Sequence, residues 1–215
     1  TNPQGGQLNL AILPTFGTRW LAPRLPQFFS EQPGITINLT TRLSQFDFQL
    51  EAVDAAIHFG QPHWPGAELA FLMSETVVPA CSAAMWAQHQ FSQPRDLIKA
   101  PLLHLASRPD AWRRWFEHQG CRVAETPGML LDQFATAAQA ATAGVGIALL
   151  PKFLIERELA NGDLVHALPG CPEMESAERY YLDWPSSRTD YPPLQVFRDW
   201  LKEAAASFMA QAQQG

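Results

Sequence analysis

Cysteine, charge and catalytic motifs are all scarce in this chain of 215 residues, and each scarcity excludes a class of protein. Charged residues make up only 17%, and 15 Lys and Arg against 21 Asp and Glu leave a net charge of −6. Because a nucleic-acid-binding surface needs clustered basic side chains, this piece of chain is not expected to bind DNA by itself. No apolar run approaches the roughly 20 residues of a membrane span, so no membrane partner is expected.

The three cysteines, Cys81, Cys121 and Cys171, form an odd set without close spacing. This pattern favours reduced thiols in a cytoplasmic protein over a disulfide framework. The start at Thr1 lacks an initiator Met, which predicts a cut edge or a linker and leaves targeting signals or further domains upstream open.

Known catalytic signatures are also missing from the sequence. It has no HExxH motif, no serine between glycines in a nucleophile elbow and no usual Gly-rich phosphate loop. His58 and His63 are separated by a Gly and a Pro, which is a poor spacing for metal ligands. Gly144 and Gly146 precede a predicted strand instead of following one, so they do not form a dinucleotide fingerprint. We therefore expect no enzyme activity, no metal and no cofactor.

What the chain does contain is an alternation of strands and helices. The apolar run at residues 8–13 predicts a buried strand, residues 14–18 predict a turn, and apolar residues at helical spacing from Leu21 to Phe29 predict a helix. Pro23 and Pro26 remove two helix donors, so this helix is expected to be regular only from about Arg24.

The rest of the chain continues the same alternation. Further strands are predicted at residues 35–41, 53–60, 68–73, 76–81, 102–105, 129–131, 144–150, 164–168 and 178–183, and helices at 82–91, 110–120, 132–141, 151–161 and 192–208. A strand, a helix and a second strand make a right-handed crossover with parallel strands. Two such sets, connected through residues 76–81 and 183–191, predict two α/β lobes joined by two hinge strands with a ligand cleft between. Lobe I is placed at residues 1–80 and 187–215, and lobe II at residues 81–186.

Polar residues stand at the ends of the predicted strands, where open α/β sheets bind ligands. The candidates are Thr15, Arg42, Ser44, His58 and Phe59 in lobe I, and His104 and Gln133 in lobe II. The helix start after the first strand offers unpaired N–H groups and a positive dipole, which together with Arg42 favour an anionic ligand. Trp64 and Trp184 fit either an apolar wall of this site or ordinary packing. Asp132 fits a helix cap better than a ligand contact.

The other candidates have structural alternatives too. Thr15 or Thr18 could cap the helix instead of donating to a ligand. Arg42 could be solvated or pair with Asp47. His58 could be a satisfied, half-buried histidine. The joint position of these residues at strand ends is what favours a ligand site.

Several stretches resemble the effector-binding domain of LysR-type transcriptional regulators. They are GQLNL at 6–10, WLAPRL at 20–25, FFSEQP at 28–33, ITI at 35–37, VDAAIHFG at 53–60 and AGVGIALLP at 143–151. In this order and spacing they cover essentially the whole chain. The turn at Thr15 and Phe16 and the stretch 46–48 are most similar to the subgroup of the glycine-cleavage activator, the β-lactamase activator and the D-serine regulator.

The resemblance implies the type-2 periplasmic-binding-protein fold, with a small effector in the cleft and a DNA-binding winged helix-turn-helix N-terminal to this chain. By the family's pattern, effectors contact Thr15, Phe16, Arg42, Leu43, Ser44, Phe59, Gly60, His104, Gln133 and Phe134. Many members carry Ser where this chain has Thr15, which keeps the hydroxyl and adds a methyl group. The resemblance also implies homodimers, in which residues 21–32 of one chain meet residues 134–143 of another, and homotetramers of the full-length protein.

Three functions follow from these patterns. The first is the effector-sensing domain of a cytoplasmic bacterial transcription regulator, which binds a small carboxylate or amino acid and changes the conformation of the DNA-bound oligomer. The second is a periplasmic solute-binding protein of a transport system, which has the same fold and needs an export signal. The third is an enzyme, which needs an acid/base pair of perturbed pKa in the cleft, and none stands out. The resemblance favours the first.

Overall fold

The computed structural model describes residues 5–212, so residues 1–4 of the cut edge or linker predicted at residues 1–6 lie outside the described part. The chain divides into two compact units. Unit 1 comprises Thr1–Ser74 with Ala177–Gly215, and unit 2 comprises Glu75–Ser176. The sequence analysis set the two boundaries later, after residues 80 and 186. They lie earlier because strand β5 (Thr76–Cys81) pairs within the sheet of unit 2, whereas β11 (Arg179–Pro185) pairs within that of unit 1.

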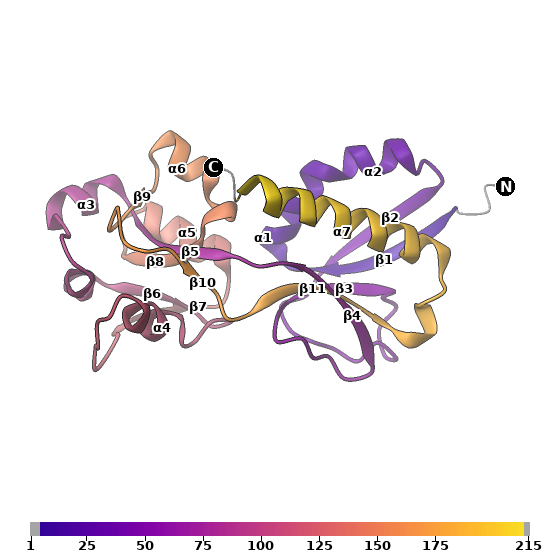
Figure 1. Ribbon diagram of the computed structural model, residues 1–215, viewed down its shortest axis with the longest axis horizontal. Helices are drawn as coiled ribbons and strands as arrows, with labels where there is room; N and C mark the ends of the chain where they lie inside the picture. Colours follow the sequence, from indigo (N-terminus) through magenta and orange to yellow (C-terminus); the bar gives the residue numbers. More distant parts are fainter. Residues whose placement is uncertain (1–4, 213–215) are drawn as a thin grey trace. The chain divides into compact units, whose positions relative to one another are not determined.

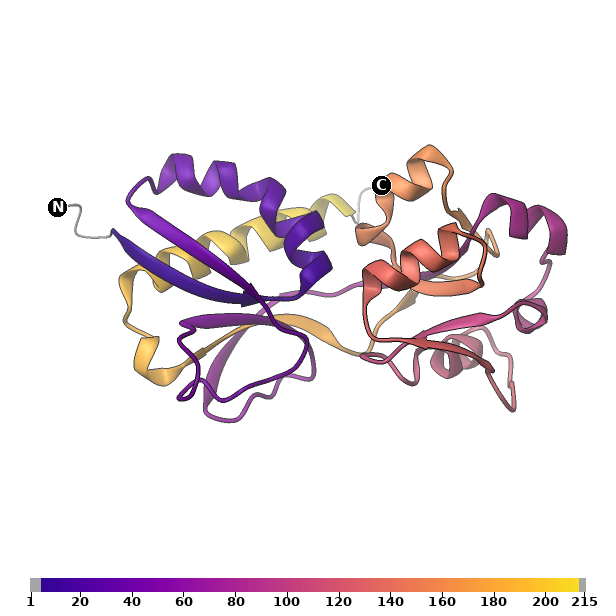
Figure 2. The same cartoon turned by 180° about the vertical axis from the view of Figure 1, so that it is seen from behind.

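Unit 1 contains one five-stranded sheet in the order β2-β1-β3-β11-β4 (Figures 1 and 2). Besides β11, its strands are β1 (Gly6–Ile12), β2 (Ile35–Thr41), β3 (Ala55–Gly60) and β4 (Ala67–Met73). Strand β1 pairs in parallel with both β2 and β3, and β11 runs antiparallel to β3 and β4. The parallel pairing of β1 with β2 confirms the predicted crossover.

The crossover between β1 and β2 is helical almost throughout. It consists of α1 (Pro14–Phe16), the π-helix η1 (Gly17–Leu21), the 3-10 helix η2 (Ala22–Arg24) and α2 (Leu25–Glu31). The turn predicted at residues 14–18 is wrong, because Pro14 starts a helix at a position where its missing N–H costs nothing. The regular helix starting only after Arg24 is confirmed, as expected from Pro23 and Pro26.

The core of unit 1 lies between the sheet and the helices that cover one side of it, α1, α2 and α7 (Pro192–Ala212) (Figures 1 and 2). The predicted apolar face of α7 is confirmed at Leu194, Phe197 and Leu201, which are fully buried. Phe28 of α2 meets Phe197 with 5.5 Å between ring centroids. A short 3-10 helix, η5 (Ser186–Arg188), follows β11 and precedes α7.

Unit 2 is built around a second sheet in the order β10-β5-β8-β6-β7, with β9 also paired to β5. Its remaining strands are β6 (Leu102–Leu105), β7 (Gly128–Leu131), β8 (Ile147–Pro151), β9 (Val165–His166) and β10 (Met174–Glu175). Strand β6 pairs in parallel with β7 and β8, whereas β5 runs antiparallel to β8. The sequence did not predict β10, because a strand of two residues shows no periodicity.

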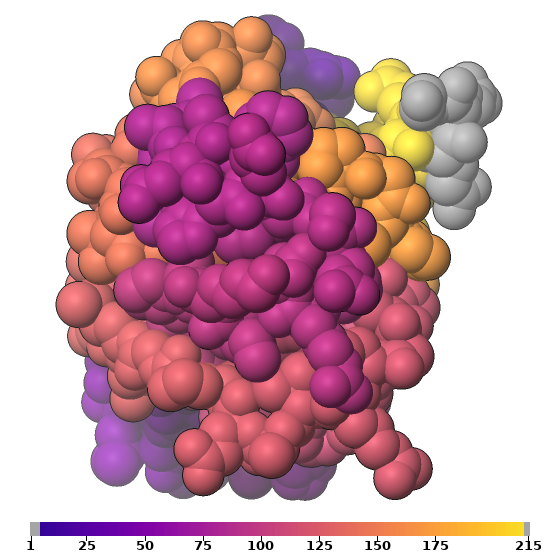
Figure 3. Space-filling model, turned by 90° about the vertical axis from the view of Figure 1, so that its left-hand side faces the viewer, coloured from indigo at the N-terminus to yellow at the C-terminus, as the bar shows by residue number. Residues whose placement is uncertain are grey.

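Helices cover both faces of this second sheet. They are α3 (Ala83–His89), η3 (Pro94–Lys99), α4 (Ala111–His118), α5 (Phe134–Thr142), η4 (Lys152–Leu154) and α6 (Glu156–Asn161). Trp112 and Trp115 of α4 pack in one apolar cluster with Leu102, and α5 packs in another with Leu103. Neighbouring residues of β6 therefore face opposite sides, as strand geometry requires. The segment of α3 and η3, purple to magenta in Figure 3, lies on the outer surface of this unit.

Two helix boundaries of unit 2 differ from the prediction. Pro151 does not start a helix but ends β8, and α6 begins only at Glu156. The N-cap position of α5 is Gln133, so Asp132 does not cap that helix. The predicted stop at residues 161–162 is confirmed, because Gly162 adopts the left-handed conformation (φ 81°) that ends helices.

Candidate functional site

A pocket of about 220 Å³ lies in unit 1 where β2 and β3 end. Its lining includes the predicted residues Arg42, Leu43, Ser44, His58, Phe59 and Gly60. The other lining residues are Ala11, Leu13, Gln45, Phe46, Ala56, Ile57 and Trp64. Because β1, β2 and β3 are parallel, their carboxyl ends meet at one edge of the sheet and bring these distant residues together.

Arg42 is a basic side chain of this pocket, and an ion pair already engages it. Its Nη2 lies 3.1 Å from Oε2 of Glu51, and its Nη1 donates to the carbonyl oxygen of Thr41 at 3.1 Å. The sequence is compatible with a solvated Arg42 or with a pair to Asp47, but the partner is Glu51. The two charged side chains are 38% and 37% exposed, so the pair stabilises the fold by at most about 1 kcal/mol. A ligand carboxylate can therefore replace Glu51 as the partner of Arg42 at a small cost in free energy.

His58 is a second polar group of the pocket, and a buried carboxylate holds it. Its Nδ1 contacts Oδ2 of Asp183 on β11, and its Nε2 lies 3.0 Å from the carbonyl oxygen of Gln61. Burial alone would lower the pKa of His58, but the hydrogen bond and charge of Asp183, with the Gln61 carbonyl, outweigh it and raise the pKa above its usual value. The alternative that His58 is a satisfied histidine is thus confirmed, although its ring still lines the pocket.

Both ring nitrogens of His58 face oxygen atoms. A carbonyl oxygen only accepts hydrogen bonds, so a bond between Nε2 and Gln61 needs a hydrogen on Nε2. On the other side, the hydrogen bond and charge of the Asp183 carboxylate favour protonation of the ring. Burial raises the pKa of Asp183, while its bond to His58 opposes that rise, so the two groups titrate as one unit. Oδ1 of Asp183 is buried without a hydrogen-bond partner among the described residues.

An aromatic cluster contributes two rings, Phe46 and Trp64, to the lining of the pocket. The rings of Phe46, Phe48 and Trp64 lie with centroids 4.9 to 5.0 Å apart, and the indole of Trp64 donates to the carbonyl oxygen of Phe46 at 3.0 Å. Trp64 is therefore both a pocket wall and a packing residue. Trp184 does not line this pocket; its indole donates to the hydroxyl of Thr189 at 3.1 Å.

Thr15 and Phe16 belong to α1 and do not line this pocket. The ring of Phe16 is buried and stacks on Trp20 and Tyr180, with 5.0 Å between centroids in both cases. The N-cap position of α1 is Leu13, so Thr15 is not the cap. Thr18 is not a cap either, since its hydroxyl donates to the carbonyl oxygen of Pro14 at 2.9 Å. A ligand contact of Thr15 and Phe16 stays a prediction.

The candidates of unit 2 lie on β6 and at the start of α5. His104 lies on β6, and its Nε2 is 2.8 Å from the carbonyl oxygen of Thr126. Gln133 is the N-cap residue of α5, and Phe134 packs at the edge of the apolar cluster beneath that helix. Their ligand contacts also stay predictions.

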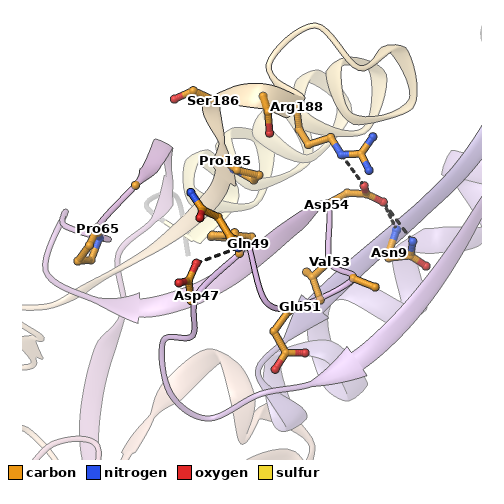
Figure 4. A pocket seen from close by; sticks show the side chains of 14 residues that line it. Asn9, Asp47, Gln49, Glu51, Val53, Asp54, Pro65, Pro185, Ser186 and Arg188 are labelled. Carbon is orange, nitrogen blue, oxygen red and sulfur yellow. Dashed lines mark hydrogen bonds and ion pairs between the residues drawn. The ribbon is translucent and has the colours of Figure 1, made fainter.

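A larger pocket of about 470 Å³, also in unit 1, was not expected from the sequence. Figure 4 shows that Asp54 accepts hydrogen bonds from the backbone and side-chain nitrogens of Asn9 and pairs with Arg188. The signal available was Asp54 itself, a charged residue at the start of an apolar strand. Its cation, Arg188, lies far away in the sequence, where no local pattern connects the two.

The described residues 5–212 also show whether the chain offers metal ligands, reactive thiols or a membrane-spanning helix. Within this range no group of three or more His, Cys, Asp or Glu side chains is placed to hold a metal ion. Cys81, Cys121 and Cys171 are free. Burial raises the pKa of the Cys81 thiol to about 11, which keeps it protonated and unreactive at neutral pH. None of the described helices combines the length and apolarity that crossing a bilayer requires.

The chain is similar in sequence to a protein family and to individual known proteins. Residues 1–206 match the family model described as the LysR substrate binding domain. The glycine cleavage system transcriptional activator of Escherichia coli K12 is 32% identical over 207 residues, which cover 94% of this chain and 66% of that protein. The HTH-type transcriptional activator AmpR of Rhodobacter capsulatus is 31% identical over 199 residues, which cover 93% and 67%.

Solved structures show the same similarity. The effector domain of the transcriptional regulator AmpR of Pseudomonas aeruginosa matches with a TM-score of 0.88 and 30% identity, covering 98% of this chain and all of that one. The AmpR effector binding domain from Citrobacter freundii matches with a TM-score of 0.83 and 26% identity, covering 94% and 98%. This chain spans about two thirds (66%) of the length of the curated activator from Escherichia coli.

Proposed function

This chain belongs to the LysR substrate binding domain family, and from that premise we propose the ligand that it binds and the way in which binding acts. The proposed effector is a small carboxylate or an amino-acid-like molecule. The carrying observation is the pocket of about 220 Å³, which gathers Arg42, Ser44 and His58 at one sheet edge.

The chemistry of this pocket favours an anionic group beside a small apolar part. The guanidinium of Arg42 is matched in shape and charge to a carboxylate. The ring of His58 and the hydroxyl of Ser44 add polar groups that can hydrogen-bond to it. Trp64 and the other aromatic rings offer an apolar wall. Since sites for drug-sized molecules occupy about 300–1,000 Å³, a pocket of about 220 Å³ suits a smaller metabolite.

Binding would act by shifting the conformational equilibrium of an oligomer. An effector that prefers one conformation of the domain shifts the population toward it. We propose that this shift changes the position of a winged helix-turn-helix DNA-binding domain that lies outside these residues. The protein would act as a cytoplasmic homodimer or homotetramer. The residues proposed for pairing are 21–32 of one chain and 134–143 of another. Exposed apolar side chains on two edge strands, Leu39 on β2 and Met129 and Leu130 on β7, support an interface between copies.

The alternatives from the sequence analysis are less well supported. The relatives and neighbours reported above are transcription regulators and their effector domains, so a transport protein is not favoured. The same relatives support a role without catalysis.

A thermal-shift screen against amino acids of both hands and small carboxylates tests this proposal. A ligand that binds only the folded state, present at about 100 times its dissociation constant, adds about 2.7 kcal/mol to the free energy of unfolding. We expect a selective rise in melting temperature with one class of carboxylate. No rise with any carboxylate or amino acid would contradict the proposed effector class.

A further inference from the structure

We propose that unit 1 carries a second ligand site, which takes a small zwitterion with one ammonium and one carboxylate group. The site is the pocket of about 470 Å³. It shares no lining residue with the pocket of about 220 Å³ proposed for the effector. A volume within the range of about 300–1,000 Å³ typical of ligand sites suits an organic molecule better than a single ion.

Charges of opposite sign lie on different walls of this second pocket. Asp47 and Glu51 come from the loop between β2 and β3, whereas Ser186, Ser187 and Arg188 come from η5. Figure 4 shows Arg188 and Ser186 on one side of the pocket and Asp47 and Glu51 on the other. A molecule with two opposite charges can therefore meet a partner at each end.

The guanidinium of Arg188, on the other wall, is held in position by a buried carboxylate. The carboxylate of Asp54, whose side chain is only 5% exposed, binds Nε of Arg188 at 3.0 Å. Asn9 fixes that carboxylate through its backbone N–H at 2.8 Å. Within residues 5–212 the two terminal nitrogens of Arg188 form no hydrogen bond to the protein. Arg188 thus presents a positioned pair of donors of the kind that binds a carboxylate.

On the acidic wall, the carboxylate of Asp47 is available to bind an ammonium group. Asp47 accepts the backbone N–H of Gln49 at 2.8 Å and has no ion-pair partner in the described part of the chain. Glu51 shares its charge with Arg42. A ligand with only one charge would satisfy either Asp47 or Arg188 and leave the other in water. A zwitterion satisfies both, which is why we infer this class.

The second pocket is physically connected to the first. Oε2 of Glu51, in the second pocket, lies 3.1 Å from Nη2 of Arg42, in the first. An ammonium group that pairs with Glu51 weakens the ion pair between Glu51 and Arg42. The guanidinium of Arg42 then becomes available to an anion in the first pocket. Binding is reciprocal, so each ligand strengthens the other by the same factor. This coupling rests on the proposed function, but the second site itself does not.

Isothermal titration of this chain with a series of ω-amino acids tests the second site. Glycine, β-alanine, 4-aminobutyrate and 6-aminohexanoate differ only in the distance between their two charges. We expect one length to bind best, and the matching amine and carboxylate with a single charge to bind on the order of tenfold more weakly, since each loses a charge-assisted hydrogen bond. Absence of binding throughout the series, or equal binding of the singly charged analogues, would overturn the proposal.

Variants then locate the ligand. Asp47→Asn and Arg188→Lys should each weaken zwitterion binding, and Glu156→Gln, an exposed acid on α6, is the matched control. Asp47 is exposed on a loop, so its change leaves the fold intact even if Arg188→Lys does not. Ser44→Trp fills the first pocket and should leave zwitterion binding in place. Loss of binding in Ser44→Trp, or unchanged binding in Asp47→Asn, would place the ligand elsewhere and refute the second site.

A further variant separates the coupling from the site. Glu51→Gln removes the partner of Arg42, so it should weaken the zwitterion and strengthen the effector identified by the thermal-shift screen. Weaker zwitterion binding with unchanged effector affinity would refute the coupling alone. If Ser44→Trp abolishes no hit of the thermal-shift screen and also leaves zwitterion binding in place, the proposed effector site is refuted and the second site stands.

Discussion

The buried pair of His58 and Asp183 predicts that unit 1 loses stability as the pH rises. Both pKa values are raised in the folded chain, so the folded pair binds its proton more tightly than the unfolded chain does. Such a contribution is fully present below the unfolded pKa and is lost as the pH rises through the folded pKa. For the histidine this loss begins near its ordinary value of about 6.5 and continues above it.

The magnitude is bounded by the one proton that the His58 ring can take up. Uptake of one proton changes the free energy of unfolding by at most about 1.4 kcal/mol per pH unit within the window. Asp183→Asn removes the charge that raises the pKa of His58 and leaves burial, which lowers it. The downward slope should therefore disappear in the variant. Removing one partner of a buried pair also costs about 3–5 kcal/mol, so Asp183→Asn should be less stable at low pH as well.

Urea unfolding followed by tryptophan fluorescence, at several values between about pH 6 and pH 8.5, measures this slope. The other titratable groups are the same in wild type and variant, so the difference between the two slopes isolates the pair. Asp190→Asn, an exposed acid in the same unit, is the matched control and should keep the wild-type slope. Equal slopes in wild type and Asp183→Asn would refute the reasoning.

Three further changes test other parts of the account. Thr15→Val should weaken effector binding without lowering the melting temperature, and unchanged affinity in a calorimetric titration would remove this residue from the site. Glu75→Gln should destabilise unit 2 by about 3–5 kcal/mol in urea unfolding, because both oxygens of the buried carboxylate bind Arg108 at 3.0 Å. Gly146→Ala should cost about 1–3 kcal/mol, since a Cβ there would lie 2.4 Å from the carbonyl oxygen of Pro101; an unchanged melting temperature would contradict this.

Much of the fold was accessible from local patterns. Alternation of apolar and polar residues, with β-branched side chains, predicted β2 with its observed bounds, and the bounds of β5 were predicted too. Helical periodicity predicted the buried face of α7. The error at Pro14 arose because proline marks turns and helix starts alike, and only the structure separates the two. The unit boundaries were misplaced because strand pairing, which assigns β5 and β11 to their sheets, is not visible in a single stretch of sequence.

The candidate site was likewise predictable from the sequence only in part. The rule that ligands meet strand ends was sufficient to gather Arg42, Ser44 and His58 around one pocket. The partners of these side chains were not predictable. Glu51 pairs with Arg42 through the path of a loop, and Asp183 meets His58 across 125 positions of sequence. Contacts of this kind depend on the completed sheet, which local periodicity does not encode.

The most direct test of the effector site is isothermal titration of the best carboxylate from the thermal-shift screen into wild type, Ser44→Trp and Glu156→Trp. Ser44→Trp fills the pocket of about 220 Å³, while Glu156→Trp places the same side chain on an exposed position of α6. The account predicts wild-type affinity in Glu156→Trp and no measurable binding in Ser44→Trp, with both variants folded. Undiminished binding in Ser44→Trp would show that the effector does not occupy this pocket.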